Sequence, residues 1–463
     1  MPSRRPLLLT LPLFLSLALA CGPAATPPPK AGPGSQPSAQ APLPPVPTAS
    51  LELAIKRAGP IQKGPPSPVL AALTQEMARY KASFAKLPEP RPYFLGYQVI
   101  ERQAVEIEAT MGAITRVAKD HRRVLGVEVR VGDYTLDNTN PASGYGFAWG
   151  GSWLLPLEDE VDRLRPTIWL ATERAHRQSR EAFSEVKAKI AVKAKEEEQS
   201  NDFSREKPLE QIMPTAAVKV DMEAWKARLR RIAAPFKAHP EIYFSQVKLM
   251  VAADNRYLIN SEGSRVQTGR TYARVGIMGH TRAVDGMDLI RSETVDAGDL
   301  SRLDTEQAMA AKVKQVITDL IALRTAPLTD PYIGPAILEG RAAGVYFHEI
   351  FGHRVEGHRQ KGHLEGQTFA KQVGKQVLPS FIDVYDDPTI TGMVGVELNG
   401  FYQVDDEGVR AQRASLVEGG VLKGFLMSRD PARGFNQSNG HGRRQESRPV
   451  VSRQGNLIVH PTQ

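Results

Sequence analysis

The sequence predicts an α+β protein in which antiparallel sheets are flanked by helices. Some segments repeat apolar residues at the spacing of a helix, and others alternate apolar and polar residues as half-buried strands do. The strands come in groups with helices before and after them, a pattern typical of α+β chains. With 463 residues, the chain is long enough for two domains with their own cores.

The predicted helices are marked by start signals and by helical spacing. The first opens at Ser67-Pro68 and ends before Pro88. Its apolar positions are Leu70, Leu73, Met77, Tyr80, Phe84 and Leu87. Further helices are predicted over 171–200, 221–234 and 304–323. The helix over 171–200 is highly charged, so we expect it to face solvent.

The predicted strands form a first group near the amino terminus and a second group before the last long helix. They cover 93–100, 104–111, 124–131, 242–252, 257–259 and 267–277. Close spacing of the first three predicts an antiparallel meander. The strand over 267–277 could offer an edge to an extended peptide.

A loop over 327–335 with three prolines and one glycine marks the predicted domain boundary. We therefore expect an amino-terminal α+β domain over 51–330. A second, β-rich domain over 331–463 would carry the metal-binding helix described below.

The amino terminus predicts export. Arg4 and Arg5 precede an apolar run over 6–20, typical of a signal peptide over 1–20 and too short for a comfortable membrane span. Cys21 follows the small-residue cleavage site and resembles the lipidated cysteine of bacterial lipoproteins. The alternative is ordinary cleavage that leaves a free thiol. We expect a lipid anchor on Cys21, in the bacterial cell envelope, on the periplasmic face or the cell surface.

Residues 21–50 are rich in Pro, Ala, Ser and Thr, which predicts a disordered tether between the anchor and the folded part. The net charge of +8 comes from Lys and Arg spread among nearly as many acids. Because no aromatic-rich basic stripe or finger motif appears, we expect no nucleic-acid partner. Attraction to anionic envelope surfaces is the more natural consequence of the charge.

The segment His348-Glu349-Ile350-Phe351-Gly352-His353 carries the clearest chemistry, because two imidazoles around a carboxylate can hold a metal ion and activate a bound water. On a regular helix, residues five apart point about 140° away from each other, whereas residues four apart differ by about 40°. The helix must therefore bend, widen or stop, and a π-type turn at Gly352 would bring the rings together.

The surroundings of the motif also carry predictions. Residues 336–340 are expected to form a short strand and turn, and a helix from Arg341 onward would be backed by core through Val345, Tyr346 and Phe347. Histidines recur at intervals of five in a chain that holds ten: His348, His353, His358 and His363. The last two either take part in the site or belong to a basic loop that faces water.

The stretch HEIFGHRVEG over 348–357 resembles the H-E-x-x-G-H-x-x-E-G signature of the TldD/PmbA family of metallopeptidases. Downstream, VDDEG over 404–408, LVEGGVLKG over 416–424 and GRR over 442–444 follow the family's order. The resemblance spans 336–447 and favours the TldD-like branch, which has the histidine motif, over the PmbA-like partner.

The resemblance implies a zinc peptidase in which His348 and His353 are ligands and Glu349 is the general base. Glu356 would accept a hydrogen bond from a ligand imidazole, or it is a solvated charge in a basic loop. Relatives form dimers whose cleft admits short or unfolded peptides. We therefore expect a homodimer or a heterodimer with a PmbA-like partner.

The family's third zinc ligand is a cysteine near the end of the fold, and this chain has only Cys21. The candidate replacements are Glu356, His358, His363, His441 and Asp383. The sequence also stops at Gln463, soon after the GRR segment, where relatives continue. We expect either a truncated sequence or a member that has lost its last strands.

The sequence thus favours an exported zinc metallopeptidase acting on peptides or unfolded polypeptides. The alternative is a catalytically silent envelope subunit that binds a partner and has an incomplete metal site. A nuclease or esterase that uses the same zinc-bound water is a third interpretation, although no G-x-S-x-G motif or phosphate loop supports it.

Overall fold

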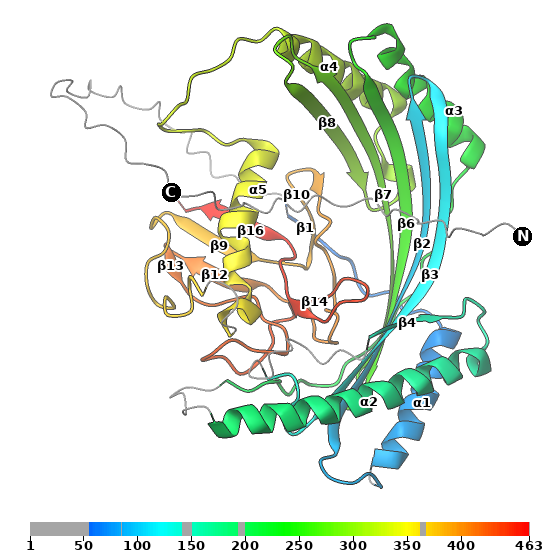
Figure 1. Ribbon diagram of the computed structural model, residues 1–463, viewed down its shortest axis with the longest axis vertical. Coiled ribbons are helices and arrows are strands. Elements are labelled where there is room, and N and C mark those ends of the chain that lie inside the picture. Colours follow the sequence, from blue (N-terminus) through cyan, green and yellow to red (C-terminus); the bar gives the residue numbers. More distant parts are fainter. Residues whose placement is uncertain (1–54, 85, 141–150, 193–199, 362–366, 463) are drawn as a thin grey trace, which may run out of the picture. The chain divides into compact units, whose positions relative to one another are not determined.

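The computed structural model describes residues 55–84, 86–140, 151–192, 200–361 and 367–462. The predicted signal peptide, Cys21, the tether and His363 lie outside the described residues. Leu51–Gln463 form one compact unit that combines helices with largely antiparallel sheets (Figure 1). The predicted α+β class is therefore confirmed. The domain boundary near residue 330 stays a prediction.

A large twisted sheet occupies the first part of this unit (Figure 1). In spatial order its strands are β4 (Ser152–Leu155), β3 (Ala113–Val131), β2 (Pro92–Thr110), β6 (Phe244–Asn260), β7 (Arg265–Arg282) and β5 (Glu210–Ile212), and β8 (Asp288–Ala297) also pairs with β7. All of these pairs are antiparallel except the β5–β7 pair. The predicted three-strand meander over 93–131 is instead the two-strand hairpin β2–β3, and β6, β7 and β8 form a second antiparallel run.

The first two predicted strands are in fact one 19-residue strand, β2. The sequence suggested a break because Glu101, Arg102 and Gln103 interrupt the apolar pattern. Glu101 is nevertheless buried, and it accepts a hydrogen bond of 2.9 Å from Tyr257 and pairs with Arg123 at 3.1 Å. Cross-strand partners thus satisfy the carboxylate, and the strand runs on.

The same polar stretch separates two cores along the sheet. Leu95, Tyr97 and Val99 of β2 belong to one core, whereas Val105 and Ile107 belong to the other. The two halves of the long strand β2 therefore contribute side chains to two different hydrophobic cores. The predicted strands at 242–252 and 257–259 are joined in the same way as the single strand β6.

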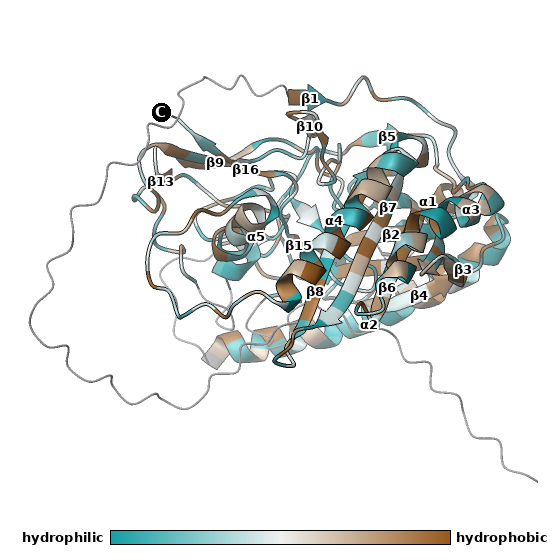
Figure 2. Ribbon diagram, turned by 90° about the horizontal axis from the view of Figure 1, so that it is seen from above, coloured by the Kyte–Doolittle hydropathy of each residue, from teal (hydrophilic) through white to brown (hydrophobic). Residues whose placement is uncertain are grey.

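Helices cover the two ends of the large sheet. They are α1 (Pro68–Phe84) and α2 (Val161–Val192) at one end, and α3 (Met222–Ala233) and α4 (Glu306–Arg324) at the other, with short 3-10 turns η2 (Ala234–Ala238) and η3 (Leu300–Arg302). Each carries both polar and apolar residues (Figure 2). The side chains of Ser67, Asp221 and Thr305 accept hydrogen bonds from the first turns of α1, α3 and α4. None of the described helices has the length and apolarity that a membrane span needs.

The charged helix expected over 171–200 to face solvent is α2 as far as it is described, and one of its faces is buried. Leu164, Ile168 and Ala171 are fully buried in the first core, together with Phe183 further along. The charged residues occupy the remaining faces of the same helix. The many charged residues of α2 thus obscured, in the sequence, the apolar face with which this amphipathic helix packs on β3.

The edge expected along 267–277 is also largely absent. β5 pairs with β7 at residues 265–267, and β8 pairs with it from Ala273 onward. Only the short stretch between these partners lacks a strand on that side. The prediction of an open edge was wrong because β5 and β8 were not recognised from the sequence.

The carboxyl-terminal part contains three small sheets, and the largest of them contributes Val384, Leu416 and Leu422 to a third core. One has the order β13 (Val421–Leu422), β12 (Ala414–Glu418), β9 (Ile382–Asp386) and β16 (Leu457–Pro461); the others are β1 (Ile55–Arg57), β10 (Ile390–Met393) and β11 (Val396–Glu397), and β14 (Gly442–Arg443) with β15 (Val451–Ser452). β1 thus connects the beginning of the described chain to the carboxyl-terminal part. The predicted β-rich character of this part is confirmed.

Buried charges join the carboxyl-terminal part to the large sheet. Arg429 is 1% exposed, and its guanidinium contacts both carboxylate oxygens of Glu262 at 2.6 and 2.8 Å. Asp406 accepts a hydrogen bond of 2.6 Å from Arg256 of β6. These pairs fix two connecting segments that follow the metal motif, around Asp406 and Arg429, to the sheet.

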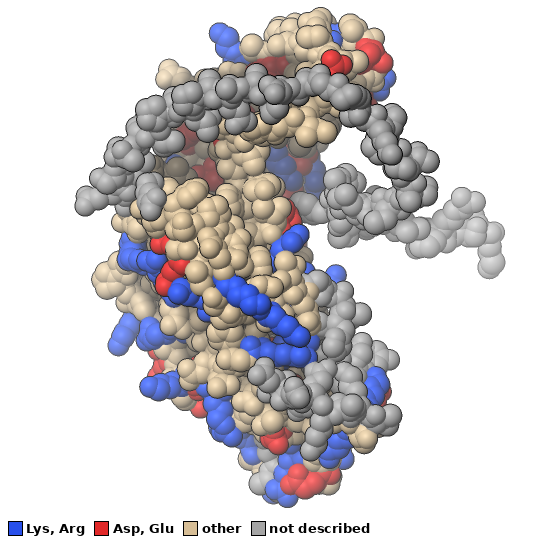
Figure 3. Space-filling model, turned by 90° about the vertical axis from the view of Figure 1, so that its left-hand side faces the viewer, with Lys and Arg blue, Asp and Glu red and all other residues tan. Residues whose placement is uncertain are grey.

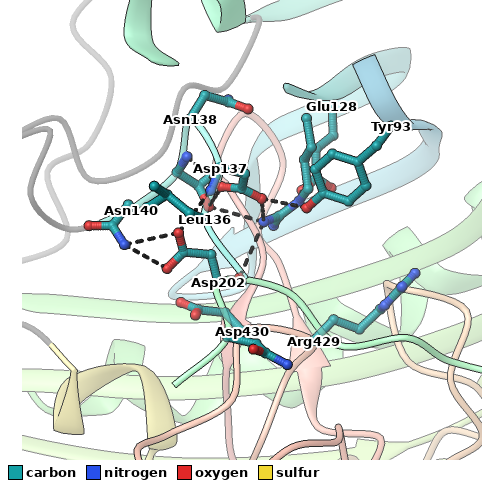
Figure 4. Close-up of polar contacts among 12 residues, drawn as sticks. Tyr93, Glu128, Leu136, Asp137, Asn138, Asn140, Asp202, Arg429 and Asp430 are labelled. Carbon is teal, nitrogen blue, oxygen red and sulfur yellow. Dashed lines mark hydrogen bonds and ion pairs between the residues drawn. The ribbon is translucent and has the colours of Figure 1, made fainter. Parts of the chain in front are cut away.

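A second buried network surrounds Asp202 (Figure 4). Asp202 accepts hydrogen bonds from the side-chain amide of Asn140 at 2.9 Å and from the backbone N–H of Asp137 at 3.0 Å. The carboxylate of Asp137 in turn pairs with Arg130 at 2.9 Å. Burial, reinforced by the charge of Asp137, raises the pKa of Asp202 to about 7.

Replacement of Leu164 by Ala tests the buried face of α2. We expect a loss of about 2–5 kcal/mol in the free energy of unfolding, because the substitution leaves a cavity in the first core. Leu170→Ala on the same helix is the matched control, since Leu170 is 50% exposed, and it should change stability by less than about 0.5 kcal/mol. Urea unfolding measures both, and equal effects would contradict the assigned faces.

The raised pKa of Asp202 predicts a pH-dependent stability. Because the pKa is about 7 in the folded chain and about 4 in an unfolded one, the folded chain binds more protons between these values, and stability falls as pH rises through them. Asp202→Asn removes the titrating group, so its unfolding free energy should decline less across this range. Denaturant unfolding at several pH values checks this, and parallel profiles for the two proteins would refute it.

Candidate metal centre

The motif lies where a helix ends. α5 (Gly340–Ile350) carries His348 and Glu349 in its last turn, and His353 follows on the 3-10 turn η4 (Gly352–Val355). The prediction that the helix must be interrupted between the two histidines is confirmed. The helix stops, however, and the suggested π-type turn is wrong, because the Phe351 N–H bonds the carbonyl of Phe347, four residues back.

This change of helix type brings the two imidazoles together. The ring centroids of His348 and His353 are 4.5 Å apart, with the rings inclined at 74°. Nε2 of His348 lies 3.9 Å from one carboxylate oxygen of Glu349, and Nε2 of His353 lies 3.7 Å from the other. One donor atom from each of the three residues lies within 4.8 Å of the others.

The cluster is open to solvent. The side chains of His348, Glu349 and His353 are 48%, 61% and 25% exposed. The expected core behind the helix is present only at Phe347, since no residue of α5 is fully buried and Val345 and Tyr346 are largely exposed. The third core reaches the motif through Phe351, with Phe347 packed against it.

The structure also corrects the segment before the helix. Residues 336–340 form no strand, and Ile337 is 88% exposed. The apolar residues there suggested a buried strand, but residues 336–340 do not pair with any strand of the described residues. α5 therefore begins from an extended, exposed approach.

Glu356 lies beneath His353. Its side chain is fully buried, and one carboxylate oxygen contacts Nδ1 of His353 at 3.0 Å. Arg359 Nε donates to the carboxylate at 2.8 Å, and Arg453 Nη1 donates to it at 3.2 Å. Glu356 is therefore not a solvent-facing charge, and it holds Nδ1 so that Nε2 faces Glu349.

The backbone around Glu356 leaves little room for movement. Gly357 N–H bonds Leu426 O at 2.8 Å, and Leu426 N–H bonds Val355 O at the same distance. A Cβ atom on Gly357 would lie 2.7 Å from Leu426 O, so only glycine fits this approach. The turns η4 and η5 (Gly357–Gln360) are thereby pinned to the segment that leads to Arg429.

The proposed third ligands are not part of the described cluster. His441 is buried, with Nδ1 2.9 Å from the carbonyl of Asn439 and Nε2 3.1 Å from Asp386 Oδ1. Asp383 accepts a hydrogen bond of 2.7 Å from Gly419 N–H. Within the described ranges the cluster comprises His348, Glu349 and His353, without Glu356 or His358. The third ligand stays a prediction.

Two buried contacts in the carboxyl-terminal part were missed from the sequence. Arg453 contacts Glu356 although the two residues lie far apart along the chain, and no local motif marks it. The second lies in the 404–408 segment, where the family pattern alone gives the acids no role. Asp405 is buried and accepts backbone N–H groups of Glu407, Val409 and Gly442, while burial raises its pKa to about 6.

Glu356→Gln tests whether the buried carboxylate orients His353. If His353 binds a metal, the affinity for added zinc should fall by about 10-fold or more, the usual scale for losing the partner of a ligand imidazole. Competition with a chelating dye measures the affinity. Glu418→Gln is the control, because that glutamate lies 58% exposed on β12 and should bind zinc like the parent. Unchanged affinity in Glu356→Gln would remove the orienting role.

Comparisons with known proteins agree with the motif. Residues 332–463 match a family model described as the PmbA/TldA metallopeptidase C-terminal domain. A metalloprotease of Archaeoglobus fulgidus is 28% identical over 214 residues, which cover 45% of this chain and 47% of that protein. A metalloprotease TldD homolog of Haemophilus influenzae is 32% identical over 134 residues, or 29% of this chain and 26% of that protein. The matches thus span less than half of these relatives.

The similarity in fold extends beyond the matched sequence. TldE from Thermococcus kodakarensis superimposes with a TM-score of 0.52 over 84% of this chain and 77% of that one, at 16% sequence identity. At this identity the likeness concerns the fold alone. The family-model match, the HEIFGHRVEG motif and the relatives named metalloproteases assign residues 332–463 to the TldD/PmbA family of metallopeptidases.

Proposed function

We propose that this chain is a zinc-dependent peptidase that hydrolyses peptides or unfolded polypeptides, with His348 and His353 as metal ligands and Glu349 as general base. The observation that carries the proposal is the gathering of these three side chains at the exposed end of α5. Relatives named metalloproteases support the same class of reaction.

The residues present fit a zinc ion. Imidazole nitrogen and carboxylate oxygen are donors that zinc accepts, and both Nε2 atoms face the same carboxylate. Ligand histidines usually donate their other N–H to a carboxylate, and Glu356 is placed to accept it from His353. A bound zinc ion would lower the pKa of a coordinated water to near neutrality and polarise the peptide carbonyl.

The protein's own groups would then position and move the proton. Glu349 lies between the two imidazoles, and as general base it would take a proton from the attacking water and return it to the leaving amine. Glu356 would keep His353 in one orientation during this exchange. The exposure of the cluster leaves room for a polypeptide to approach from solvent.

One observation favours a second function. The described cluster contains two histidines and Glu349, and the chain's only cysteine is Cys21. If Glu349 had to complete the metal shell, no base would be left at the site. The alternative is therefore a silent subunit that binds a partner, as a homodimer or with a PmbA-like chain.

The location belongs to the proposal as well. The charged start at Arg4 and Arg5, the apolar run over 6–20 and Cys21 support export and lipid anchoring in the bacterial envelope. Peptides in that compartment would then be the substrates. Metabolic labelling with a fatty acid, compared between the parent and Cys21→Ser, tests the anchor.

Glu349→Gln separates the two functions. We expect the variant to keep its zinc and to lose at least about 100-fold in the rate of peptide hydrolysis, because the base is lost while both imidazoles stay. Elemental analysis gives zinc per chain, and a fluorogenic peptide gives the rate.

The controls make each outcome informative. The double variant His348→Ala, His353→Ala should lose the zinc altogether. Loss of zinc from Glu349→Gln would show that Glu349 is a ligand. Full activity of that variant would refute the mechanism, and a parent protein without zinc would favour the silent subunit.

A further inference from the structure

A groove of about 590 Å³ lies away from the metal cluster and has no assigned role. It is lined by Tyr134, Asn201, Phe203, Arg205 and residues 435–437. The lining combines aromatic rings, side-chain amides and one guanidinium. We propose that this groove binds the peptide substrate through a carboxylate, with Arg205 as its partner; the inference rests on the proposed peptidase function.

The floor of the groove is a rigid stack of rings and guanidinium groups. The ring of Phe203 lies between Arg130 and Arg429, whose Cζ atoms are 3.6 and 3.9 Å from its centroid. Tyr134 stacks on Phe203 at 6.3 Å and 14°, and Arg205 lies over Tyr134 with Cζ 3.8 Å from the ring centroid. Cations over aromatic faces stabilise such an arrangement.

Hydrogen bonds hold this stack in place. Tyr134 donates its hydroxyl to Glu262 at 2.8 Å, and Phe203 N–H bonds the carbonyl of Tyr134 at 3.1 Å. Ser204 N–H bonds the carbonyl of Arg429 at 2.7 Å. The groove is therefore already shaped before a ligand arrives, which lowers the entropy cost of binding.

Arg205 provides the charge that a carboxylate needs. Its side chain is exposed, and no carboxylate of the described residues forms an ion pair with it. Tyr134 fixes the flat face of the guanidinium, so its N–H edge can donate two parallel hydrogen bonds to a carboxylate. The amides of Asn201, Asn436 and Gln437 can serve the peptide backbone, whatever its sequence.

The groove shares its supports with the metal turn. Lys361, which follows η5, donates from Nζ to the carbonyl of Asn201 at 3.0 Å. Phe435 packs against Phe425 in the third core, which also contains Phe351 at the end of α5. A peptide seated in the groove would therefore rest on the framework that carries the motif.

The carboxylate could come from an acidic side chain or from the free carboxyl end of the peptide. The chemistry of Arg205 is the same for both. A fluorescein-labelled peptide, made with both carboxylates, with either one, or with neither, distinguishes these sources. Amidation removes the terminal charge, and Asn in place of Asp removes that of the side chain.

Fluorescence anisotropy with the Glu349→Gln protein, measured with and without added zinc, follows binding without cleavage. Adding Arg205→Gln should weaken binding of the peptides that carry the recognised carboxylate by about 10-fold, or about 1.4 kcal/mol, and leave the others unchanged. Arg282→Gln is the matched control, because Arg282 is 63% exposed on β7 and outside the groove. Tyr134→Leu, which removes the platform under Arg205, should show the same selective loss.

Circular dichroism confirms folding of each variant. An equal loss for every peptide, or no loss in Arg205→Gln, would overturn the assignment of the groove. The result is independent of the test of Glu349, since it uses binding alone. Carboxylate-selective binding without any hydrolysis would support the role of the groove and refute the peptidase function. Hydrolysis without this selectivity would support the peptidase function and refute the role of the groove.

Discussion

The arrangement of the carboxyl-terminal part depends on the buried guanidinium of Arg429. It pairs with Glu262, bonds the carbonyl of Ser204 and lies over Phe203. Only three residues earlier, Leu426 bonds Val355 and Gly357 of the metal turn. One short segment therefore connects the metal turn to the large sheet. A guanidinium taken out of water is tolerated only with such partners, and removing one would leave a costly unpaired charge.

Glu356 applies the same constraint closer to the cluster. A fully buried carboxylate requires compensation, and Arg359, Arg453 and His353 provide it. The orientation of His353 is thereby coupled to a charge network that cannot rearrange without exposing a bare carboxylate. This explains how an exposed helix end can present a defined pair of imidazoles. The order comes from the buried turn beneath α5 and not from packing around the helix.

The parts of this structure that sequence could predict are those that local residues determine. Ser67 and Asp221 mark helix starts because a cap bonds the first turn of its own helix. Similarly, the five-residue spacing of His348 and His353 requires a break in the helix, and α5 ends there. The π-type turn failed as a prediction because stopping the helix solves the same geometric problem, and spacing alone does not distinguish the two.

The parts that escaped prediction depend on partners distant in sequence. Glu101 looked like the end of a strand until Tyr257 and Arg123 supplied its partners from neighbouring strands. The role of Arg453 beneath His353 has no local signature either. Conversely, α5 was expected to be backed by core through Val345, Tyr346 and Phe347, whereas Val345 and Tyr346 face solvent and only Phe347 packs against the third core. The sequence pattern shows which face of a helix is apolar. Only the tertiary structure shows whether another part of the protein packs against that face.

The exposure of the cluster has a consequence for substrate selection under the proposed function. Among the described residues, the three side chains of the cluster are 25–61% exposed, so they do not enclose a scissile bond by themselves. Discrimination must then come from contacts made by more distant parts of the polypeptide. The stacked groove at Tyr134 and Arg205 is supported by Arg429, which also connects the metal turn to the sheet. A peptide bound in the groove would be held at a fixed position relative to Glu349. The protein could then select among peptides although its metal cluster is open to solvent.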